Sequence, residues 1–451
     1  MPKDAVVIGG GLAGLTAAVA LTDAGWRVTV IERRSMLGGR ARSFPDPASG
    51  DLVDNGQHVF VGCYDATLRF FKRLRTDHGI TFQDRLEVTY AEAGREKFGR
   101  LKALNLPAPW HLAGGLLGFS YLSLWDKLAM VKVPQAARAA LQGDSQLLDQ
   151  MTVSGWLQQL GQSQRARHVF WDPLAIATLN DDPNRASALG FATVLDKMFS
   201  SEPQACRLGL ANVGLSDLYT DQSTRVIEDG GGTVKLNTSV AGLEIEDERL
   251  GGVRLASGEL IRADAVVSSV TPQELLRLVP EDFRQGEATW ERIGQFRSSG
   301  ILSIHLWLDR EVLTEPFVGL IGTWAQWLFN RPRLVTGGTT RHVALVVSAA
   351  TDDLQLTNAQ LVTKALKDLS QTISAIREAT VLRSQVIREP HATVSTPAGS
   401  AAWRPGPQAG WNNFILAGDW TDTGLPATME SAVLSGYRAA EKVLAVARPG
   451  R

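Results

Sequence analysis

Three glycines near the N-terminus are the first residues whose type and spacing suggest chemistry. They have the spacing G-x-G-x-x-G and are Gly9, Gly11 and Gly14. In a dinucleotide-binding motif, such glycines permit a tight turn, let the backbone approach a pyrophosphate, and let a helix pack closely on a strand. Leu12 and Ala13 begin an apolar stretch, and the positive end of a helix starting there would face the phosphates. These residues predict a binding site for the diphosphate of a dinucleotide.

The elements on either side complete this motif. Residues 6–8 form a β-branched run typical of a strand buried on both faces, and residues 12–23 predict a buried helix. Residues 27–31 predict a second strand, which ends at Glu32. The Glu32 carboxylate is placed to accept hydrogen bonds from an adenosine ribose, with Arg33 beside it as a further contact. The alternative, a glycine-rich turn without a ligand, would not require a strand, a helix, a second strand and an acidic residue in this order and spacing.

A second glycine pair follows closely and favours a flavin dinucleotide. Gly38 and Gly39 again allow close backbone approach, and Arg40 adds a fixed positive charge. A nicotinamide dinucleotide has no particular need of a second phosphate-facing loop, whereas FAD is longer and stays bound. The alternative is a simple surface turn. The position directly after the fingerprint favours FAD.

The C-terminal part of the chain offers a second anchor for the same cofactor. A strand is predicted to end at Gly418 and Asp419, and a helix to run through residues 436–447. Between them lie four further candidate contacts, Pro426, Ala427, Thr428 and Met429. In a flavoprotein this helix N-terminus would face the flavin edge where reduction builds negative charge, and Asp419 would accept hydrogen bonds from ribityl hydroxyls. The two ends of the chain are expected to meet on one cofactor.

Composition narrows the class of protein further. The chain has 451 residues and a formal net charge of -1, so it can bury a large core and nothing argues for nucleic acid as a partner. Its two cysteines, Cys63 and Cys206, cannot build a disulfide framework, and a reducing, cytoplasmic location fits them. The apolar N-terminus lacks the basic leader and cleavage site of a signal peptide.

The order of the predicted elements indicates an α/β fold, with a Rossmann-type FAD-binding domain and an interleaved α+β substrate domain. Gly251-Gly252 and Ser257-Gly258 predict the two turns of a small meander. Strands predicted within residues 300–348 form a sheet that either walls a cavity for an apolar substrate or simply builds a core. The FAD-binding domain is expected to comprise residues 1–75, 220–290 and 405–451, and the substrate domain residues 76–219 and 291–404.

Residues 103–125 carry no charged side chain. Pro107 and Pro109 interrupt this run, and the apolar residues that remain are too few for the roughly 20 that a membrane span needs. The segment therefore predicts an interfacial or tunnel-mouth element that contacts the membrane from one side, or an ordinary buried pair of helices.

These motifs together resemble those of the flavin amine-oxidase and carotenoid-desaturase superfamily, over essentially the full length of the chain. The matching residues are the glycine fingerprint, Glu32, Gly38-Gly39-Arg40, Gly231-Gly232 and Leu416-Ala417-Gly418-Asp419. The resemblance implies FAD as the cofactor. It also implies that the backbone of Val240 meets the adenine.

More narrowly, several stretches look like the hydroxysqualene dehydroxylase family. They are residues 54–58 (DNGQH), Trp171-x-Pro173-Leu174 with Asn180, residues 326–331 (QWLFNR), and residues 418–432, which begin GDWTDTGLPAT. Within the first stretch, Gly56, Gln57 and His58 are expected to contact the cofactor. The family implies an isoprenoid lipid substrate and an electron donor as partners, in isoprenoid and hopanoid biosynthesis.

The implied reaction removes the allylic hydroxyl group of hydroxysqualene and delivers hydride from reduced flavin, which gives squalene. Hydroxide leaves badly, so an acid must protonate the departing oxygen. The candidate acids are His58, Asp172 and Asp422. His58 has the alternative role of bonding a backbone carbonyl, and Asp172, which precedes Pro173, has the alternative role of a helix cap.

Two other functions fit the same motifs. An oxidative desaturase of phytoene, diapophytoene or a squalene-like polyene would use oxidised flavin on the same fold. A noncatalytic flavin-binding protein that presents lipid precursors to other enzymes would also suit the uncharged segment. Turnover separates this last function from the two enzymes, and the redox state consumed separates the enzymes from each other.

Overall fold

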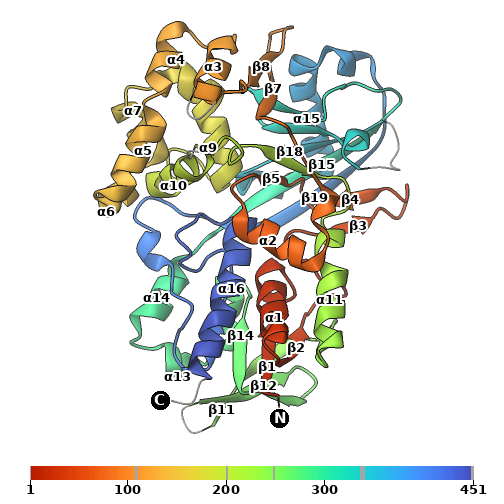
Figure 1. The fold of residues 1–451 in the computed structure, drawn as a ribbon. Helices are drawn as coiled ribbons and strands as arrows, with labels where there is room; N and C mark the ends of the chain where they lie inside the picture. Colours follow the sequence, from red (N-terminus) through yellow and green to blue (C-terminus); the bar gives the residue numbers. More distant parts are fainter. Residues whose placement is uncertain (1, 107–109, 200–201, 247–248, 336–340, 448–451) are drawn as a thin grey trace.

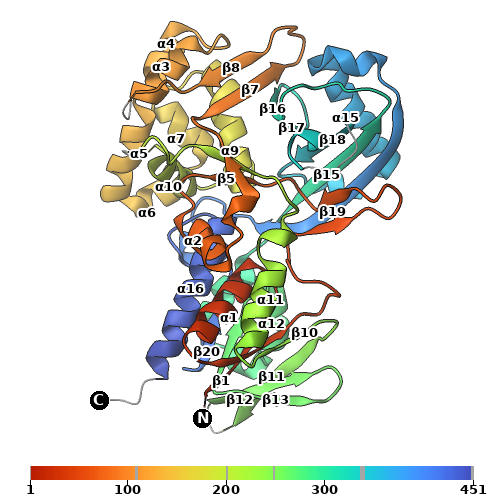
Figure 2. The same cartoon turned by 45° about the vertical axis from the view of Figure 1, so that its right-hand side comes forward.

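The computed structural model describes residues 2–106, 110–199, 202–246, 249–335 and 341–447. In Figure 1 the first strand and the last helix of the chain lie together in the lower half, where helices cover a sheet, and a second sheet and a group of helices form the upper half. The same division is visible after a turn of 45° in Figure 2. On this arrangement we propose the two-domain division predicted above, with FAD bound by the lower half.

The lower half is built on a parallel sheet drawn from both ends of the chain. Its strand order is β10-β2-β1-β14-β20, and every neighbouring pair is parallel. The strands are β1 (Asp4–Ile8), β2 (Arg27–Ile31), β10 (Thr233–Lys235), β14 (Ala265–Ser268) and β20 (Phe414–Leu416). Helices α1 (Leu12–Asp23), α11 (Thr220–Asp229) and α16 (Met429–Val446) lie side by side over one face (Figure 1). The predicted fingerprint strands and helix, and the α/β fold class, are confirmed.

A small antiparallel meander lies against the other face of this sheet. It comprises β11 (Val240–Glu246), β12 (Arg249–Leu255) and β13 (Leu260–Arg262). The turn predicted at Ser257-Gly258 is present, but the one predicted at Gly251-Gly252 is wrong, because both glycines lie inside β12. A Cβ on Gly252 would stand 2.1 Å from the carbonyl oxygen of Ile261, so this glycine serves a close approach of strands and not a turn. Residues 247–248, between β11 and β12, lie outside the described residues.

The upper half holds a seven-stranded sheet in the order β19-β15-β18-β17-β16-β7-β8, antiparallel except for β16 and β7. Its strands are β7 (Glu87–Glu92), β8 (Gly99–Lys102), β15 (Ser298–Leu308), β16 (Phe317–Ile321), β17 (Trp327–Asn330), β18 (His342–Val347) and β19 (Val381–Val394). Helix α15 (Asn358–Thr372) covers one face and begins with the capping box of Thr357 and Gln360. The other face looks toward the helices of the upper half.

Those helices form a compact group at the upper left of Figure 1. They are α3 (Trp110–Gly118), α4 (Leu124–Met130), α5 (Val133–Gln142), α6 (Ser145–Asp149), α7 (Val153–Gln159), α8 (Gln164–Ala166), a π-helical turn (Arg167–Trp171), α9 (Asp172–Leu179) and α10 (Ala188–Met198). Among the described residues, no helix combines the length and the hydropathy that crossing a membrane requires.

Short elements connect the two halves. A hairpin of β3 (Ser43–Pro45) and β4 (Leu52–Asp54) is followed by a three-stranded sheet of β5 (Val59–Val61), β6 (Ile80–Phe82) and β9 (Leu208–Ala211). Helix α2 (Asp65–Leu74) packs beside α16. On the opposite side of the parallel sheet lie α12 (Pro272–Leu278), α13 (Glu281–Arg284) and α14 (Ala288–Gln295). These connections leave a space between the two large sheets.

Candidate active site

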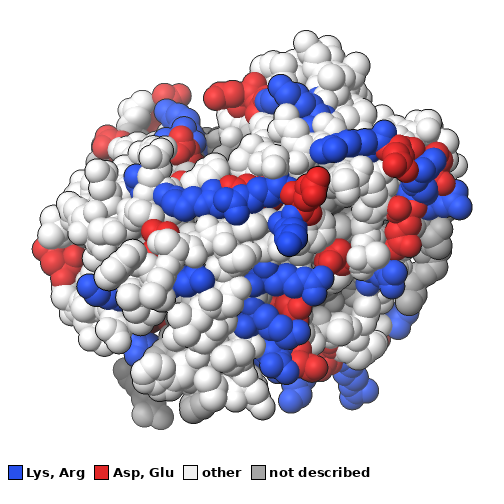
Figure 3. Space-filling model, turned by 90° about the horizontal axis from the view of Figure 1, so that it is seen from above, with Lys and Arg blue, Asp and Glu red and all other residues white. Residues whose placement is uncertain are grey.

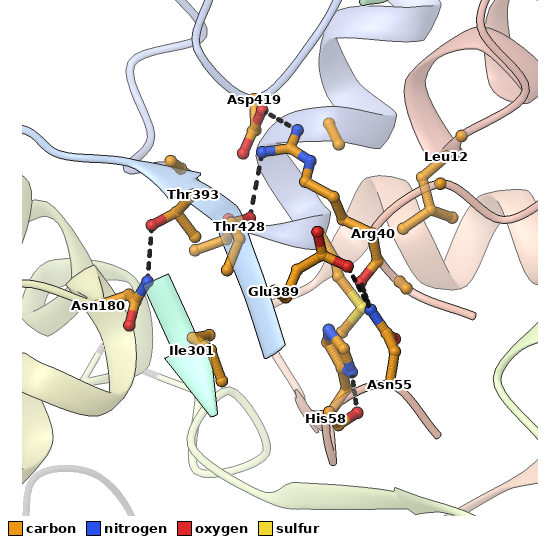
Figure 4. A pocket seen from close by; sticks show the side chains of 18 of the residues that line it. Leu12, Arg40, Asn55, His58, Asn180, Ile301, Glu389, Thr393, Asp419 and Thr428 are labelled. Atoms are coloured by element: carbon orange, nitrogen blue, oxygen red, sulfur yellow. Dashed lines mark hydrogen bonds and ion pairs between the residues drawn. The ribbon is translucent and has the colours of Figure 1, made fainter. Parts of the chain in front are cut away.

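That space contains a cavity of about 570 Å³ that reaches from the parallel sheet to the large antiparallel sheet. One end is lined by the loops after β1 and β2 and by the N-termini of α1 and α16. The other end is lined by apolar side chains, among them Val88, Tyr90, Leu101, Leu174, Ile301, Phe317, Trp327, Phe329 and Val346. Figure 4 shows side chains from both ends around the cavity. One continuous site therefore offers backbone amides at one end and a hydrocarbon surface at the other.

Two glycine loops face each other at the polar end. Gly39 has a left-handed φ of +56°, and a Cβ placed on it would lie 3.1 Å from the Cα of Gly11. Side chains are therefore excluded between the loops, and backbone N–H groups at the N-terminus of α1 are free to meet phosphate oxygens. Gly14 has another role, because a Cβ there would stand 2.0 Å from the carbonyl oxygen of Gly9. It lets α1 pack on β1 and does not line the cavity.

Glu32 lines the cavity where β2 ends. Its Oε2 accepts a hydrogen bond from the backbone N–H of Gly10 at 2.8 Å, and its Oε1 accepts one from Arg34 at 2.9 Å. These bonds fix the orientation of the carboxylate and order the glycine loop. Each carboxylate oxygen can still accept a further bond, so the geometry is compatible with a ribose hydroxyl.

Arg40 and Asp419 join the first part of the chain to the last. The Arg40 Nη2 lies 2.6 Å from the Asp419 Oδ1, and Arg40 also donates to the carbonyl of Ala392 at 3.1 Å (Figure 4). Arg40 therefore serves as a tie between three segments of the cavity wall. Arg40 lines the cavity, and the carboxylate of Asp419 lies against its positive charge.

The N-terminus of α16 lines the cavity as predicted from the sequence. Thr428 caps the helix, because its hydroxyl accepts from the backbone N–H of Ser431 at 3.2 Å. Glu430 turns away and accepts from the backbone N–H groups of Ala66 and Thr67 at 2.8 and 2.9 Å, which binds α16 to the start of α2. Pro426 lines a neighbouring cavity of about 440 Å³.

The structure thus brings most of the predicted cofactor contacts to one cavity. Those that line it are Gly9, Gly11, Leu12, Ala13, Glu32, Arg33, Gly38, Gly39, Arg40, Gly56, Gln57, His58, Val240, Gly418, Asp419, Ala427, Thr428 and Met429. Two glycine loops without side chains, two helix N-termini and a fixed carboxylate suit an elongated anionic dinucleotide. These residues fit FAD.

His58 is the one predicted acid that lines the cavity. Its Nδ1 lies 2.7 Å from the carbonyl oxygen of Gly56. A carbonyl only accepts, so Nδ1 carries the hydrogen and the neutral ring offers the lone pair of Nε2. Burial lowers the pKa of His58, which favours this neutral form. Figure 4 shows the second ring nitrogen turned away from Gly56, on the side of Glu389.

Asp172 and Asp422 lie outside the lining of this cavity. Asp172 stands in the first turn of α9, and burial raises the pKa of its carboxyl group. Its Oδ1 has no hydrogen-bond partner among the described residues. Asp422 is exposed, and its Oδ1 accepts from the backbone N–H of Gly424 at 3.2 Å. Neither residue lines the cavity that is expected to hold the reacting groups.

Sequence reasoning missed Glu389, a buried carboxylate on β19 that lines the cavity. Its Oε2 lies 3.3 Å from the Nδ2 of Asn55 and 3.4 Å from the Nη1 of Arg42. Burial and the neighbouring Arg34 lower the pKa of Arg42. No local sequence motif distinguishes Glu389 from the other polar residues of its strand. The sequence offered one indirect indication, the two polar stretches at residues 40–42 and 54–58, because Glu389 bonds to a residue of each.

Two of the motifs singled out in the sequence meet in a buried ion pair. The Nη1 of Arg331 lies 2.7 Å from the Oδ2 of Asp54, and the two side chains are 4% and 1% exposed. Arg331 also donates to the side-chain oxygen of Gln57 and, at 3.0 Å, to the carbonyl of Leu52. An arginine only donates, so the oxygen of the Gln57 amide must face it. Arg331 thereby fixes a residue that lines the cavity.

The fold and this cavity define an FAD-dependent oxidoreductase. The chain belongs to the family described as flavin containing amine oxidoreductase, which matches residues 12–444. Its cofactor is FAD, as predicted. A solved structure of wild-type putrescine oxidase bound to putrescine superimposes with a TM-score of 0.74 at 16% identity, covering 99% of each chain. At that identity the likeness shows the fold.

Curated relatives narrow the comparison within this superfamily. A hydroxysqualene dehydroxylase of Rhodopseudomonas palustris is 30% identical over 99% of this chain and 100% of its own length. One from Sinorhizobium fredii is 28% identical over 98% of this chain and 99% of its own length. A 15-cis-phytoene desaturase of Synechococcus elongatus is 24% identical, covering 97% of this chain and 95% of its own. The predicted resemblance to the hydroxysqualene dehydroxylase family is confirmed.

Proposed function

We propose that this protein uses reduced FAD to convert hydroxysqualene to squalene. The full-length similarity to hydroxysqualene dehydroxylases carries this proposal. The C–O bond breaks, the oxygen leaves as water after it takes up a proton, and a hydride replaces it on the carbon. Reduced FAD, when bound, supplies that hydride, and an external electron donor restores the reduced state.

The apolar end of the cavity supports a hydrocarbon substrate. Its walls come from β7, β8, β15 to β18 and α9, and they include Phe317, Trp327 and Phe329. Such a surface binds a polyene by removing apolar area from water. The same walls exclude water from the reacting carbon, and aromatic faces stabilise a delocalised allylic cation.

His58 is the residue we propose for protonating the departing oxygen. The hydrogen bond from Nδ1 to Gly56 keeps the ring in one orientation, and a proton taken up from solvent would reside on Nε2. Because the pKa of His58 is lowered from 6.5, its cationic form is present only in more acidic solution. The rate of a step that needs this proton should fall as pH rises through a value below 6.5.

Glu389 completes this proposal electrostatically. Its carboxylate is buried and lines the same cavity as His58. A fixed negative charge at Glu389 favours a developing allylic cation over the neutral ground state, whereas the carboxylate that favours the imidazolium form of His58 is that of Asp54. Its bonds to Asn55 and Arg42 hold it in place.

An exposed apolar surface at α3 and α4 supports the proposal that the protein meets a membrane from one side. Trp110, Leu117, Leu124, Trp125 and Leu128 are 52–81% exposed there. Figure 3, which views the molecule from above, shows wide uncharged areas beside groups of mixed basic and acidic side chains. Exposed tryptophan and leucine side chains of this kind suit the boundary between water and a bilayer. A cytoplasmic protein on the inner face of the membrane could then take its substrate from the lipid.

The second candidate is an oxidative desaturase, which the phytoene desaturase relatives favour. The two functions require opposite redox states. Photoreduced protein incubated anaerobically with hydroxysqualene should form squalene in a single turnover, with reoxidation of the flavin absorbance. Double bonds introduced into phytoene or squalene by the oxidised protein, with hydroxysqualene untouched, would favour the desaturase. If neither substrate reacted, a lipid-presenting role would replace both.

The same single-turnover assay tests His58. His58→Ala should lower the rate of flavin reoxidation about 10²–10⁴-fold while FAD stays bound, since a general acid contributes that much. His78→Ala is the matched control, because His78 lies on an exposed turn and does not line the cavity. Equal rates for both variants, or loss of FAD from His58→Ala alone, would show that His58 is not the acid.

A further inference from the structure

Strand β19 carries a bulge where it passes the cavity. Ile301 of β15 pairs with Glu389, but Ser299 pairs with Thr393, so two steps along β15 correspond to four along β19. The two extra residues bend β19, and Glu389, Ala392 and Thr393 all line the cavity as a result. Bulges of this kind redirect side chains and are frequent beside active sites.

Asn180 fixes the orientation of the Thr393 hydroxyl group through a hydrogen bond. It is 5% exposed and ends α9 in the left-handed conformation, with φ of +50°. Its Oδ1 accepts from the backbone N–H of Ala349 at 2.8 Å, and that partner can only donate. Its Nδ2 must therefore be the atom that faces Thr393 and donates to the Oγ1 at 2.9 Å, and to the carbonyl of Ser299 at 3.3 Å.

The hydroxyl hydrogen of Thr393 is consequently left for another acceptor. The Oγ1 already receives the hydrogen bond from Asn180, so its own O–H points elsewhere. Within the described ranges, no acceptor bonds this hydrogen, and the side chain lines the cavity. In Figure 4 Thr393 lies with Asn180 and Ile301, on the side of the cavity away from Leu12 and Arg40. Thr393 is half-buried in the cavity wall, so a ligand that displaces water from it would leave this hydroxyl unpaired unless the ligand itself offers an oxygen.

We propose that Thr393 binds the hydroxyl oxygen of an alcohol substrate, and that Asn180 positions Thr393 for this role. The proposal rests on the proposed function, because it assigns the group that recognises the oxygen of hydroxysqualene. A hydrocarbon has no oxygen to accept this bond. The Thr393 hydroxyl therefore gives the cavity its preference for the allylic alcohol over the corresponding hydrocarbon.

The preference can be measured without turnover. Oxidised holoenzyme is titrated anaerobically with hydroxysqualene and, separately, with squalene in detergent micelles, and each dissociation constant is read from the perturbation of the bound flavin spectrum. Wild-type protein should bind the alcohol more tightly. The ratio that matters is the dissociation constant of squalene divided by that of hydroxysqualene. Thr393→Val should reduce this ratio about three- to tenfold, because one neutral hydrogen bond to the alcohol is lost. Thr393→Ser keeps the hydroxyl and should keep the ratio.

Thr178 provides the matched control. It also lines the cavity, but its hydroxyl donates to the carbonyl of Leu174 at 2.8 Å within α9. Thr178→Val should therefore leave the ratio unchanged. Asn180→Ala frees the Thr393 hydroxyl to rotate, and should lower the ratio by a smaller factor than Thr393→Val, without changing the affinity for squalene.

The inference is overturned if Thr393→Val keeps the wild-type ratio, or if it weakens both ligands equally, as a merely structural change would. It is also overturned if Thr393→Val alters the affinity for FAD, because the hydroxyl would then serve the cofactor. These binding results do not depend on catalysis. Failure of reduced wild-type protein to form squalene would instead refute the proposed function, whatever the ratio.

Discussion

The buried pair of Arg331 and Asp54 gives a stability prediction that can be worked from the structure. Arg331→Met removes the cation and leaves the Asp54 carboxylate with the hydroxyl of Ser43, at 2.5 Å, as its remaining side-chain partner. Loss of one partner of a buried ion pair costs about 3–5 kcal/mol, because the other charge stays buried without compensation. The near-complete burial of both side chains places this pair in that class.

The corresponding change in melting temperature follows from the size of the chain. Unfolding entropy is about 2.1 cal/mol/K per residue, which gives about 1 kcal/mol/K for a chain of 451 residues. Arg331→Met should therefore lower the melting temperature by about 3–5 °C in thermal unfolding at saturating FAD. Arg333→Met is the matched control, because its pair with Glu311 is 54% and 48% exposed. Its shift should stay below about 1 °C.

A double variant tests the cause of this loss. Asp54→Asn in the Arg331→Met background removes the uncompensated charge, so the double variant should be more stable than the sum of the single changes predicts. Strictly additive losses would refute the buried-charge reasoning, because they would show that the two side chains do not interact. A melting temperature equal to wild type for Arg331→Met alone would refute it as well.

Three further predictions concern the cofactor, acid stability and the membrane. Glu32→Ala should weaken FAD binding about ten- to hundredfold in fluorescence titrations, since a charged hydrogen bond is lost; an unchanged constant would exclude a ribose contact. Burial lowers the pKa of His342 to about 3, so the native state stays neutral while the unfolded chain takes up a proton below about pH 6.5. In urea unfolding, His342 should accordingly contribute a fall in stability of about 1.4 kcal/mol per pH unit between about pH 6 and 4, in addition to that of His305, whose pKa is also lowered; His342→Gln should reduce the slope. Leu117→Glu with Trp125→Glu should shift the protein from liposome pellet to supernatant, whereas Leu382→Glu, at a residue 66% exposed on β19, should not; equal sedimentation of both variants would argue against membrane contact through α3 and α4.

The first β-α-β unit could be read from the sequence because its signals are local. The strand of residues 6–8, the three glycines and the acidic residue at position 32 constrain their neighbours directly through backbone conformation and burial. The C-terminal helix, predicted through residues 436–447, is also present, but it begins at Met429, where Thr428 caps it. The local pattern gave a wrong prediction at Gly251-Gly252. Glycine is needed at position 252 because a carbonyl of the next strand lies too close for a side chain, and not because the chain turns there.

The choice among polar residues depended on the tertiary structure. His58, Asp172 and Asp422 were all candidate acids in the sequence, but of the three only His58 lines the cavity, because α9 and the loop after β20 direct the two aspartates elsewhere. Conversely, Glu389 and Thr393 have no local signature. They face the cavity because β19 bulges against β15, and pairing between strands nearly a hundred residues apart cannot be read from either strand alone. The sequence by itself determined the cofactor and the family, since glycine spacing and strand ends are properties of short segments; which side chains meet the substrate was decided by the packing of the two sheets around one cavity.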